Sequence, residues 1–234
     1  MAILFDGRLS SGTFAPYNRI DIAPGSSDVP PIHAGREGFY ERVLDPIGGA
    51  RYVAKLTAYS GAPGRCEMRP SVEDPAGPGP DYGTRWFYFE TLFLDWPIDR
   101  SRSVTASISS KLGDARDMIA QLHDTADVGD TTHQPPFMLA VEGERIYFYT
   151  SYDTATPTVA TAPNLRIMQW FPLERTKWVK WALHIKYTIN GDGFMHLYKD
   201  RRKVYSVTGT LTAYNDTGGP FFKSGIDKFF GVNS

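Results

Sequence analysis

Residues 181–207 read WALHIKYTINGDGFMHLYKDRRKVYSV, and this stretch decides the fold. Over 181–187, large apolar residues alternate with smaller or polar ones, which is the period of a half-buried strand. The NGDG run that follows (190–193) readily supplies the positive φ angles of a tight hairpin. The chain then returns over 194–199, and after the charged DRR turn a third strand is expected over 203–207. Three strands joined in this way form an antiparallel meander.

Similar patterns precede the meander. A second pair of strands is predicted over 138–141 and 145–150, on either side of the turn EGE. Residues 85–94 (RWFYFETLFL) are apolar at nearly every position, which is typical of a strand buried on both faces. The only stretch with helical character is short, at 114–121, and it fits the entry of a strand equally well. Many short strands and regular turns predict an all-β fold, a concanavalin-like β-jelly roll of two antiparallel sheets packed as a sandwich.

Length and composition agree with one such domain. All-β sandwiches commonly reach roughly 200–250 residues as a single unit, and this chain has 234. We therefore expect one β-jelly-roll domain over residues 1–234, with a loop or arm at about 1–40. The turn-rich stretch 23–35 (APGSSDVPPIHAG) belongs to that arm. A second Pro- and Gly-rich break, at 70–80, is interpreted as a surface loop because strand-like sequence flanks it on both sides.

Charge and cysteine content exclude several classes of protein. A formal net charge of -1 argues against nucleic-acid binding, which needs a surplus of Lys and Arg. The single cysteine, Cys66, excludes an intrachain disulfide framework and a multi-cysteine zinc site. No apolar run is long enough for a membrane span, and Asp6 and Arg8 interrupt the segment where a secretory signal would lie. Without a signal peptide, we expect a virion-associated protein or one released by lysis, and otherwise a cytoplasmic one.

The first of three polar clusters is RCEMR, at 65–69. On a strand, Arg65, Glu67 and Arg69 share one face. Because burying three charges carries a heavy desolvation cost, this face is expected to be a wet groove or the surface. Taken alone, such a pattern usually marks no more than a solvated face.

Two further clusters have the same alternation. QLH (121–123) places Gln121 and His123 on one face and turns Leu122 to the core. FFKSGID (221–227) places four residues on one side of a strand, namely Phe221, Lys223, Gly225 and Asp227. Taken alone, His123 is most simply a hydrogen-bonded structural residue, and Lys223 by itself indicates little.

Together the three clusters resemble the jelly-roll polysaccharide lyases: the alginate lyases and, more distantly, the glucuronan lyase and heparin lyase I groups. Those families carry an Arg-(Ser/Thr)-Glu-Leu-Arg strand, a Gln-(Ile/Val)-His strand and a terminal Tyr-Phe-Lys-x-Gly-x-Tyr strand. Here the same strands read RCEMR, QLH and FFKSGID, in the same order. The stretch 86–96, which leads into the turn DWP (95–97), and the stretch 178–198, with its GDG turn, are weaker similarities. The resemblance spans roughly residues 65–227.

The resemblance implies β-elimination on a uronic-acid polysaccharide bound at the concave face. In this chemistry a base removes the proton at C5, a cation or amide stabilises the charge on the uronate carboxylate, and an acid protonates the departing O4. Carried over by position, Gln121 and Arg69 bind and neutralise the uronate, and His123 is the candidate base or neutraliser. Arg65, Glu67 and Lys223 then shape the subsite for the acidic sugar.

The terminal motif departs from the family at two positions. The catalytic Tyr of the family, its acid and often also its base, falls on Asp227, and the opening Tyr is Phe221. An aspartate is ionised at pH 7 in solution, so it cannot donate a proton unless its pKa is strongly raised, and its charge repels a uronate. Three other phenols are candidate substitutes from neighbouring strands: Tyr198, Tyr205 and Tyr214. The residues alone agree equally with an active and an inactive lyase.

Two other functions remain open. One is a non-catalytic glycan-binding or structural component of a bacteriophage tail or capsid, built on the lyase scaffold and docking to other virion proteins or to copies of itself. The other is a jelly roll that binds no sugar. No cofactor or metal is expected: Asp124, Asp127 and Asp130 recur every third residue, but their spacing is not that of an EF-hand, and we interpret them as a solvated loop.

Overall fold

The computed structural model describes residues 17–22, 38–48, 51–58, 65–70, 83–94, 117–131, 133–160 and 163–228, and every regular element there is a strand. The predicted loops at 23–35 and 71–80 lie outside these ranges. Among the described residues no helix is long and apolar enough to cross a membrane. The strands are β1 (Tyr17–Ile22), β2 (Gly38–Leu44), β3 (Tyr52–Ala58), β4 (Arg65–Pro70), β5 (Gly83–Thr91), β6 (Asp117–Thr125), β7 (Phe137–Glu142), β8 (Arg145–Thr150), β9 (Arg166–Pro172), β10 (Val179–Tyr187), β11 (Gly193–Lys199), β12 (Arg202–Thr210) and β13 (Gly218–Lys228).

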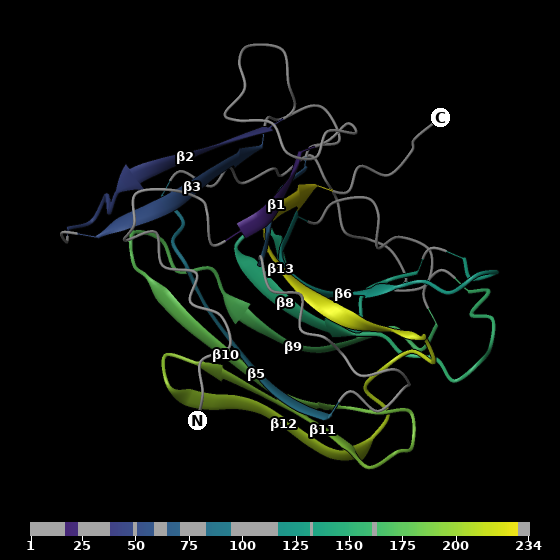
Figure 1. Cartoon of the computed structure of the whole chain (residues 1–234). Helices are drawn as coiled ribbons and strands as arrows, with labels where there is room; N and C mark the ends of the chain where they lie inside the picture. Colours follow the sequence, from purple (N-terminus) through teal and green to yellow (C-terminus); the bar gives the residue numbers. More distant parts are fainter. Residues whose placement is uncertain are drawn as a thin grey trace.

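These strands form two large antiparallel sheets and a hairpin (Figure 1). The seven-stranded sheet has the order β1-β4-β13-β6-β7-β8-β9, and the four-stranded sheet has the order β12-β11-β10-β5. Among the described strands, β2 and β3 pair only with each other. The two large sheets stack as a sandwich, which confirms the predicted all-β jelly roll.

The core lies between the two sheets and is filled by alternate residues of each strand. Leu122, Phe137 and Phe148 point inward from the seven-stranded sheet and are fully buried. Trp181 and Leu183 meet them from β10 of the four-stranded sheet. Fully burying an apolar side chain of this size contributes about 1.5–3 kcal/mol, so the alternation itself fixes which face of each strand turns outward.

The predicted meander is present as β10, β11 and β12, and the predicted pair at 138–150 is present as β7 and β8. Of the stretch 114–121, the described part (117–121) belongs to a strand, β6, rather than to a helix. The prediction for 85–94 is wrong, because β5 is buried on one face only: Trp86 is 36% exposed and Tyr88 is 61% exposed. β5 is an edge strand whose outward aromatics pack on one another, and Trp86 stacks on His184 with ring centroids 4.0 Å apart.

A buried carboxylate anchors the β2–β3 hairpin to the four-stranded sheet. The indole Nε1–H of Trp178 lies 3.0 Å from both carboxylate oxygens of Asp45, and Arg51 Nε donates to the same carboxylate at 3.0 Å. Arg51 also lies over the Trp178 ring and bonds Glu90 on β5. The hydrogen bond from Trp178, reinforced by the one from Arg51, lowers the pKa of Asp45.

We therefore expect Asp45→Asn to lower the melting temperature and to shift the fluorescence of Trp178, because the amide cannot serve both donors as a carboxylate does. The sign of the pH effect follows from the lowered pKa: the stabilisation is present above the ordinary Asp pKa and is lost as the pH falls through the folded-state value. The difference in melting temperature between the two proteins should shrink in acid. A difference that is constant from pH 7 to pH 3 would contradict this account of the anchor.

Candidate active site

The three strands that carry the polar motifs lie side by side as β4, β13 and β6, with β13 in the middle (Figure 1). Glu67 is in register with Gly225, Gln121 with Lys223, and His123 with Phe221. Residues directly opposite on adjacent strands point to the same face. The motifs, which are distant in sequence, are therefore brought to one part of the seven-stranded sheet.

The core fixes the face on which the polar residues stand. Leu122 is fully buried in the core, as predicted, and Phe222 packs against the same cluster. Their neighbours in the chain must point the opposite way, because side chains alternate along a strand. Gln121, His123 and Lys223 accordingly stand on the face of the sheet that turns away from the sandwich core.

On that face Glu67 joins the other two motifs. The Gln121 side-chain N–H donates to Glu67 Oε1 at 2.5 Å, and Lys223 Nζ lies 3.6 Å from Glu67 Oε2. Gly225 occupies the position of β13 opposite Glu67, and its lack of a side chain leaves Glu67 and Gln121 free to meet across the middle strand. The result is a hydrogen-bonded carboxylate–amide–ammonium cluster, which we call the Glu67 cluster (Glu67, Gln121 and Lys223).

The Glu67 cluster is buried, and this corrects one prediction. The charged face of 65–69 was expected to be wet, yet Glu67 and Gln121 are each 1% exposed and Lys223 is 5% exposed. The desolvation cost is offset by pairing, since the Glu67 carboxylate receives an amide hydrogen and faces an ammonium group. Gln121 Oε1 accepts no hydrogen bond from any described residue. The amide of Gln121 is thus held through its nitrogen alone.

His123 is the more open member of the site. Its side chain is 32% exposed, and its ring stacks on Phe221 with centroids 5.3 Å apart and planes 18° apart. Nδ1 lies 2.6 Å from the backbone oxygen of Asp124. A carbonyl oxygen can only accept, so Nδ1 carries the hydrogen and Nε2 carries the lone pair of the neutral ring. This is the tautomer that a general base needs.

Three predicted site residues have described backbone only. Arg65 and Arg69 lie on β4, and Asp227 lies on β13 in register with Arg65 and, on its other side, with Met118. Their side chains fall outside the described residues, so their assigned roles stay predictions.

None of the three substitute phenols lies on the face of the Glu67 cluster. Tyr198 belongs to the four-stranded sheet, and Tyr205 packs against the core between the sheets. Tyr214 is buried, and its hydroxyl bonds the backbone oxygen of Gln134. Sequence reasoning missed Tyr147 and Tyr149 on β8, which pack beside Met138 on the same face as Gln121. Their alternation with the core residue Phe148 was the available signal.

Comparison with known proteins agrees with this geometry. A family model described as "Polysaccharide lyase" matches residues 11–228. The fold resembles that of an endo-β-1,4-glucuronan lyase from the fungus Trichoderma reesei, with a TM-score of 0.62 and 14% identity over 90% of this chain and 79% of that one. It also resembles a family 7 alginate lyase in complex with substrate, with a TM-score of 0.52 and 12% identity over 97% of this chain and 90% of that one. A search of curated proteins by sequence gives no match.

The two structural matches, at 14% and 12% identity, show the fold alone. The family model covers every described strand from β1 to β13 and includes all three polar motifs. Fold, motif order and family model therefore agree, and this chain belongs to the polysaccharide lyase family.

Proposed function

We propose that the protein binds an acidic, uronic-acid polysaccharide over the face of the Glu67 cluster and cleaves it by β-elimination. The observation that carries this proposal is the Gln121–Glu67 hydrogen bond, two residues along β6 from the partly exposed His123 in its base-competent tautomer. A carboxylate that holds an amide in one orientation preorganises the second N–H of that amide. Preorganised donors at a developing charge are commonly the largest contribution to catalysis.

The proposed reaction assigns one role to each group. His123 Nε2 takes the C5 proton, and the electron pair of the broken C–H bond becomes the new C4–C5 double bond. The C4–O4 bond breaks, and the departing O4 takes a proton from solvent water, because Asp227 is ionised at neutral pH. The second amide N–H of Gln121 and the guanidinium of Arg69 stabilise the negative charge that builds on the uronate carboxylate during proton removal. Arg65, Glu67 and Lys223 shape the sugar subsite, and Glu67 is a positioning residue for Gln121.

The aspartate at position 227 determines how much lyase activity we expect from the natural protein. A solvated carboxyl has a pKa of about 3.9, so at neutral pH it carries no proton for O4 and repels the uronate. We expect Asp227→Tyr to raise kcat/KM by up to about 10²-fold, because it supplies a phenolic proton donor at this position of β13. The rate is read as ultraviolet absorbance of the unsaturated product.

The substrate test uses separate incubations with polymannuronate, polyguluronate, glucuronan and heparin. New absorbance with one of them identifies the substrate class. If neither the natural protein nor Asp227→Tyr forms product from any polymer, the proposed elimination is wrong. The matched control is Asp192→Tyr, which places the same phenol at the exposed turn between β10 and β11. This variant should leave the rate of product formation unchanged.

A second candidate function is glycan binding without cleavage, and Asp227 is the observation that favours it. This candidate predicts that the natural protein is retained on an immobilised uronate polymer and forms no product from it. Retention should then be equal for His123→Ala, since a base is not needed for binding. Attachment of such a module to a phage particle remains a separate prediction, which mass spectrometry of purified particles tests.

A further inference from the structure

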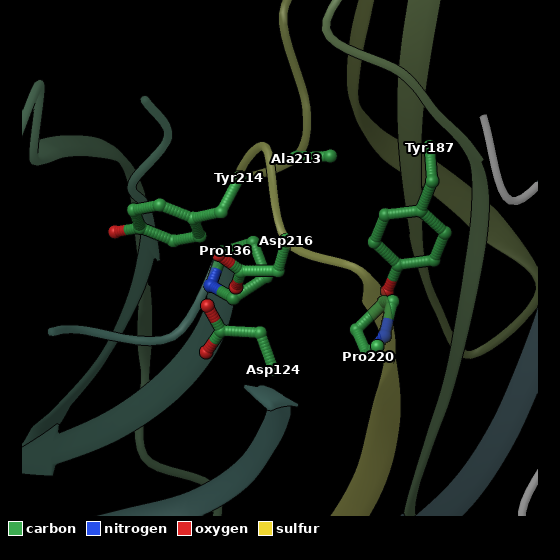
Figure 2. Close-up of a pocket in the computed structure, with 8 residues that line it drawn as sticks. Asp124, Pro136, Tyr187, Ala213, Tyr214, Asp216 and Pro220 are labelled. Atoms are coloured by element: carbon green, nitrogen blue, oxygen red, sulfur yellow. The ribbon is translucent and has the colours of Figure 1, made fainter. Parts of the chain in front are cut away.

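A second buried polar cluster lies where β6 ends and β13 begins, and it consists of Asp124, His133 and Asp216. His133 Nε2 contacts Asp124 Oδ2 and lies 3.7 Å from Asp216 Oδ2. One oxygen or nitrogen from each residue lies within 4.8 Å of the other two. The side chains are at most 6% exposed. Figure 2 shows the carboxyl groups of Asp124 and Asp216 close together, with the Tyr214 ring beside them.

The surroundings fix the orientation of His133. Its Nδ1 lies 2.9 Å from the backbone oxygen of Thr131, so Nδ1 donates a hydrogen and Nε2 is directed at the two carboxylates. The ring of Tyr214 lies 3.9 Å from the imidazole, centroid to centroid, and its own hydroxyl bonds Gln134 and Ser151. Histidines that bind metals are generally held in this way, with the far ring nitrogen donating to a carbonyl or carboxylate.

A single proton on the His133 imidazole does not neutralise the two carboxylates of the cluster. Two carboxylates face one imidazole, which offers at most one positive charge. A divalent cation bound to the neutral imidazole would neutralise the two negative charges of the carboxylates. Its binding would release the proton on Nε2 to solvent.

We propose that Asp124, His133 and Asp216 form a binding site for a divalent transition-metal ion, of which zinc is the best fit. Calcium and magnesium take oxygen ligands, whereas an imidazole with carboxylates suits zinc and its neighbours in the first transition row. The second oxygen of either carboxylate completes four-fold coordination. This proposal does not depend on the proposed lyase activity.

The burial of Asp124 corrects the interpretation of the three regularly spaced aspartates as a solvated loop. Asp124 is buried in the cluster, while Asp130 accepts the backbone N–H groups of Asp127 and Thr158. Asp127 in turn accepts the N–H and hydroxyl of Thr217, next to Asp216. Of the three, therefore, Asp124 is a ligand and the other two tie the neighbouring loops together. Sequence spacing gave no sign of this, because His133 and Asp216 come from other segments.

The test starts with the full chain stripped by a chelator and dialysed into metal-free buffer. We expect one equivalent of Zn²⁺ to bind, measured by elemental analysis after gel filtration, and the melting temperature to rise with Zn²⁺ concentration. Co²⁺ should occupy the same site and give the visible absorbance of a tetrahedral complex, which Zn²⁺ then bleaches. A larger rise with Ca²⁺ than with Zn²⁺, or no stoichiometric binding of Zn²⁺, overturns the proposal.

Asp216→Asn separates a metal site from a simple ion pair. Without metal, this variant should melt at or above the temperature of the natural protein, because one of two crowded carboxylates is removed. It should lose the Zn²⁺-dependent rise and the Co²⁺ spectrum. His184→Gln, on the outer face of the other sheet, is the matched control and should keep both. If Asp216→Asn keeps the full rise, or if His184→Gln loses it, the cluster is not the site.

Discussion

Replacing His123 by alanine is expected to lower kcat/KM for cleavage of the uronate polymer by about 10²–10⁴-fold, which is the usual contribution of a general base. The fold should survive, because the side chain is 32% exposed and its contacts among the described residues include the Phe221 ring and a backbone oxygen. The rate is followed as ultraviolet absorbance of the unsaturated product, alongside a thermal melt. Binding of the polymer should change much less than the rate.

The control for this variant is His196→Ala. His196 lies on β11 and stacks on Phe194 in the four-stranded sheet, far from the β4-β13-β6 face in the strand order. It should leave the rate unchanged while removing a similar amount of imidazole surface. If the His123→Ala protein keeps the full rate, another group is the base and His123 only lines the sugar subsite.

Glu67→Gln is expected to reduce the free energy of unfolding by about 3–5 kcal/mol, the usual cost of leaving one charge of a buried pair without its partner. Glu67 and Lys223 are both buried, and their charged groups lie 3.6 Å apart. The glutamine keeps the shape of the side chain and an oxygen for Gln121, so the loss reports the removal of the Glu67 charge beside the Lys223 ammonium group rather than a cavity. Urea denaturation measures it.

The double variant Glu67→Gln with Lys223→Met tests whether the loss of stability comes from the charge that remains on Lys223. Removing both charges should cost less than Glu67→Gln alone, because no buried charge is then left behind. The surface pair Arg175–Glu144, at 2.7 Å but largely accessible to solvent, provides the comparison. Glu144→Gln should cost no more than about 1 kcal/mol. If Glu67→Gln lowers the free energy of unfolding by no more than Glu144→Gln does, the buried pair of Glu67 and Lys223 contributes no more to stability than a surface pair.

The fold was predictable because strand patterning is local. The alternation in 181–187 and the turn after it define β10 and β11 without knowledge of any partner strand. The same rule correctly turned Leu122 to the core. It failed for β5, where both faces are apolar in sequence and only the position at a sheet edge leaves Trp86 and Tyr88 outside.

The candidate site was predictable only in part, because contacts between strands depend on register. The three motifs were expected to meet, and the strand order places them together. The burial of Glu67 was missed, since the charge pattern of 65–69 does not reveal that Lys223 and Gln121 will compensate it. His133 and Asp216 carried no signal, because each is an isolated residue whose partners are supplied by distant segments.

The position of β13 between β4 and β6 has a consequence for biosynthesis. The last strand described inserts into the middle of the larger sheet and not at its edge. A nascent chain therefore presents the unsatisfied backbone groups of β4 and β6 until residue 228 has left the ribosome, and only then can the sheet close. Such non-local pairing is slow to form, so a chain arrested before β13 is expected to aggregate or to recruit chaperones.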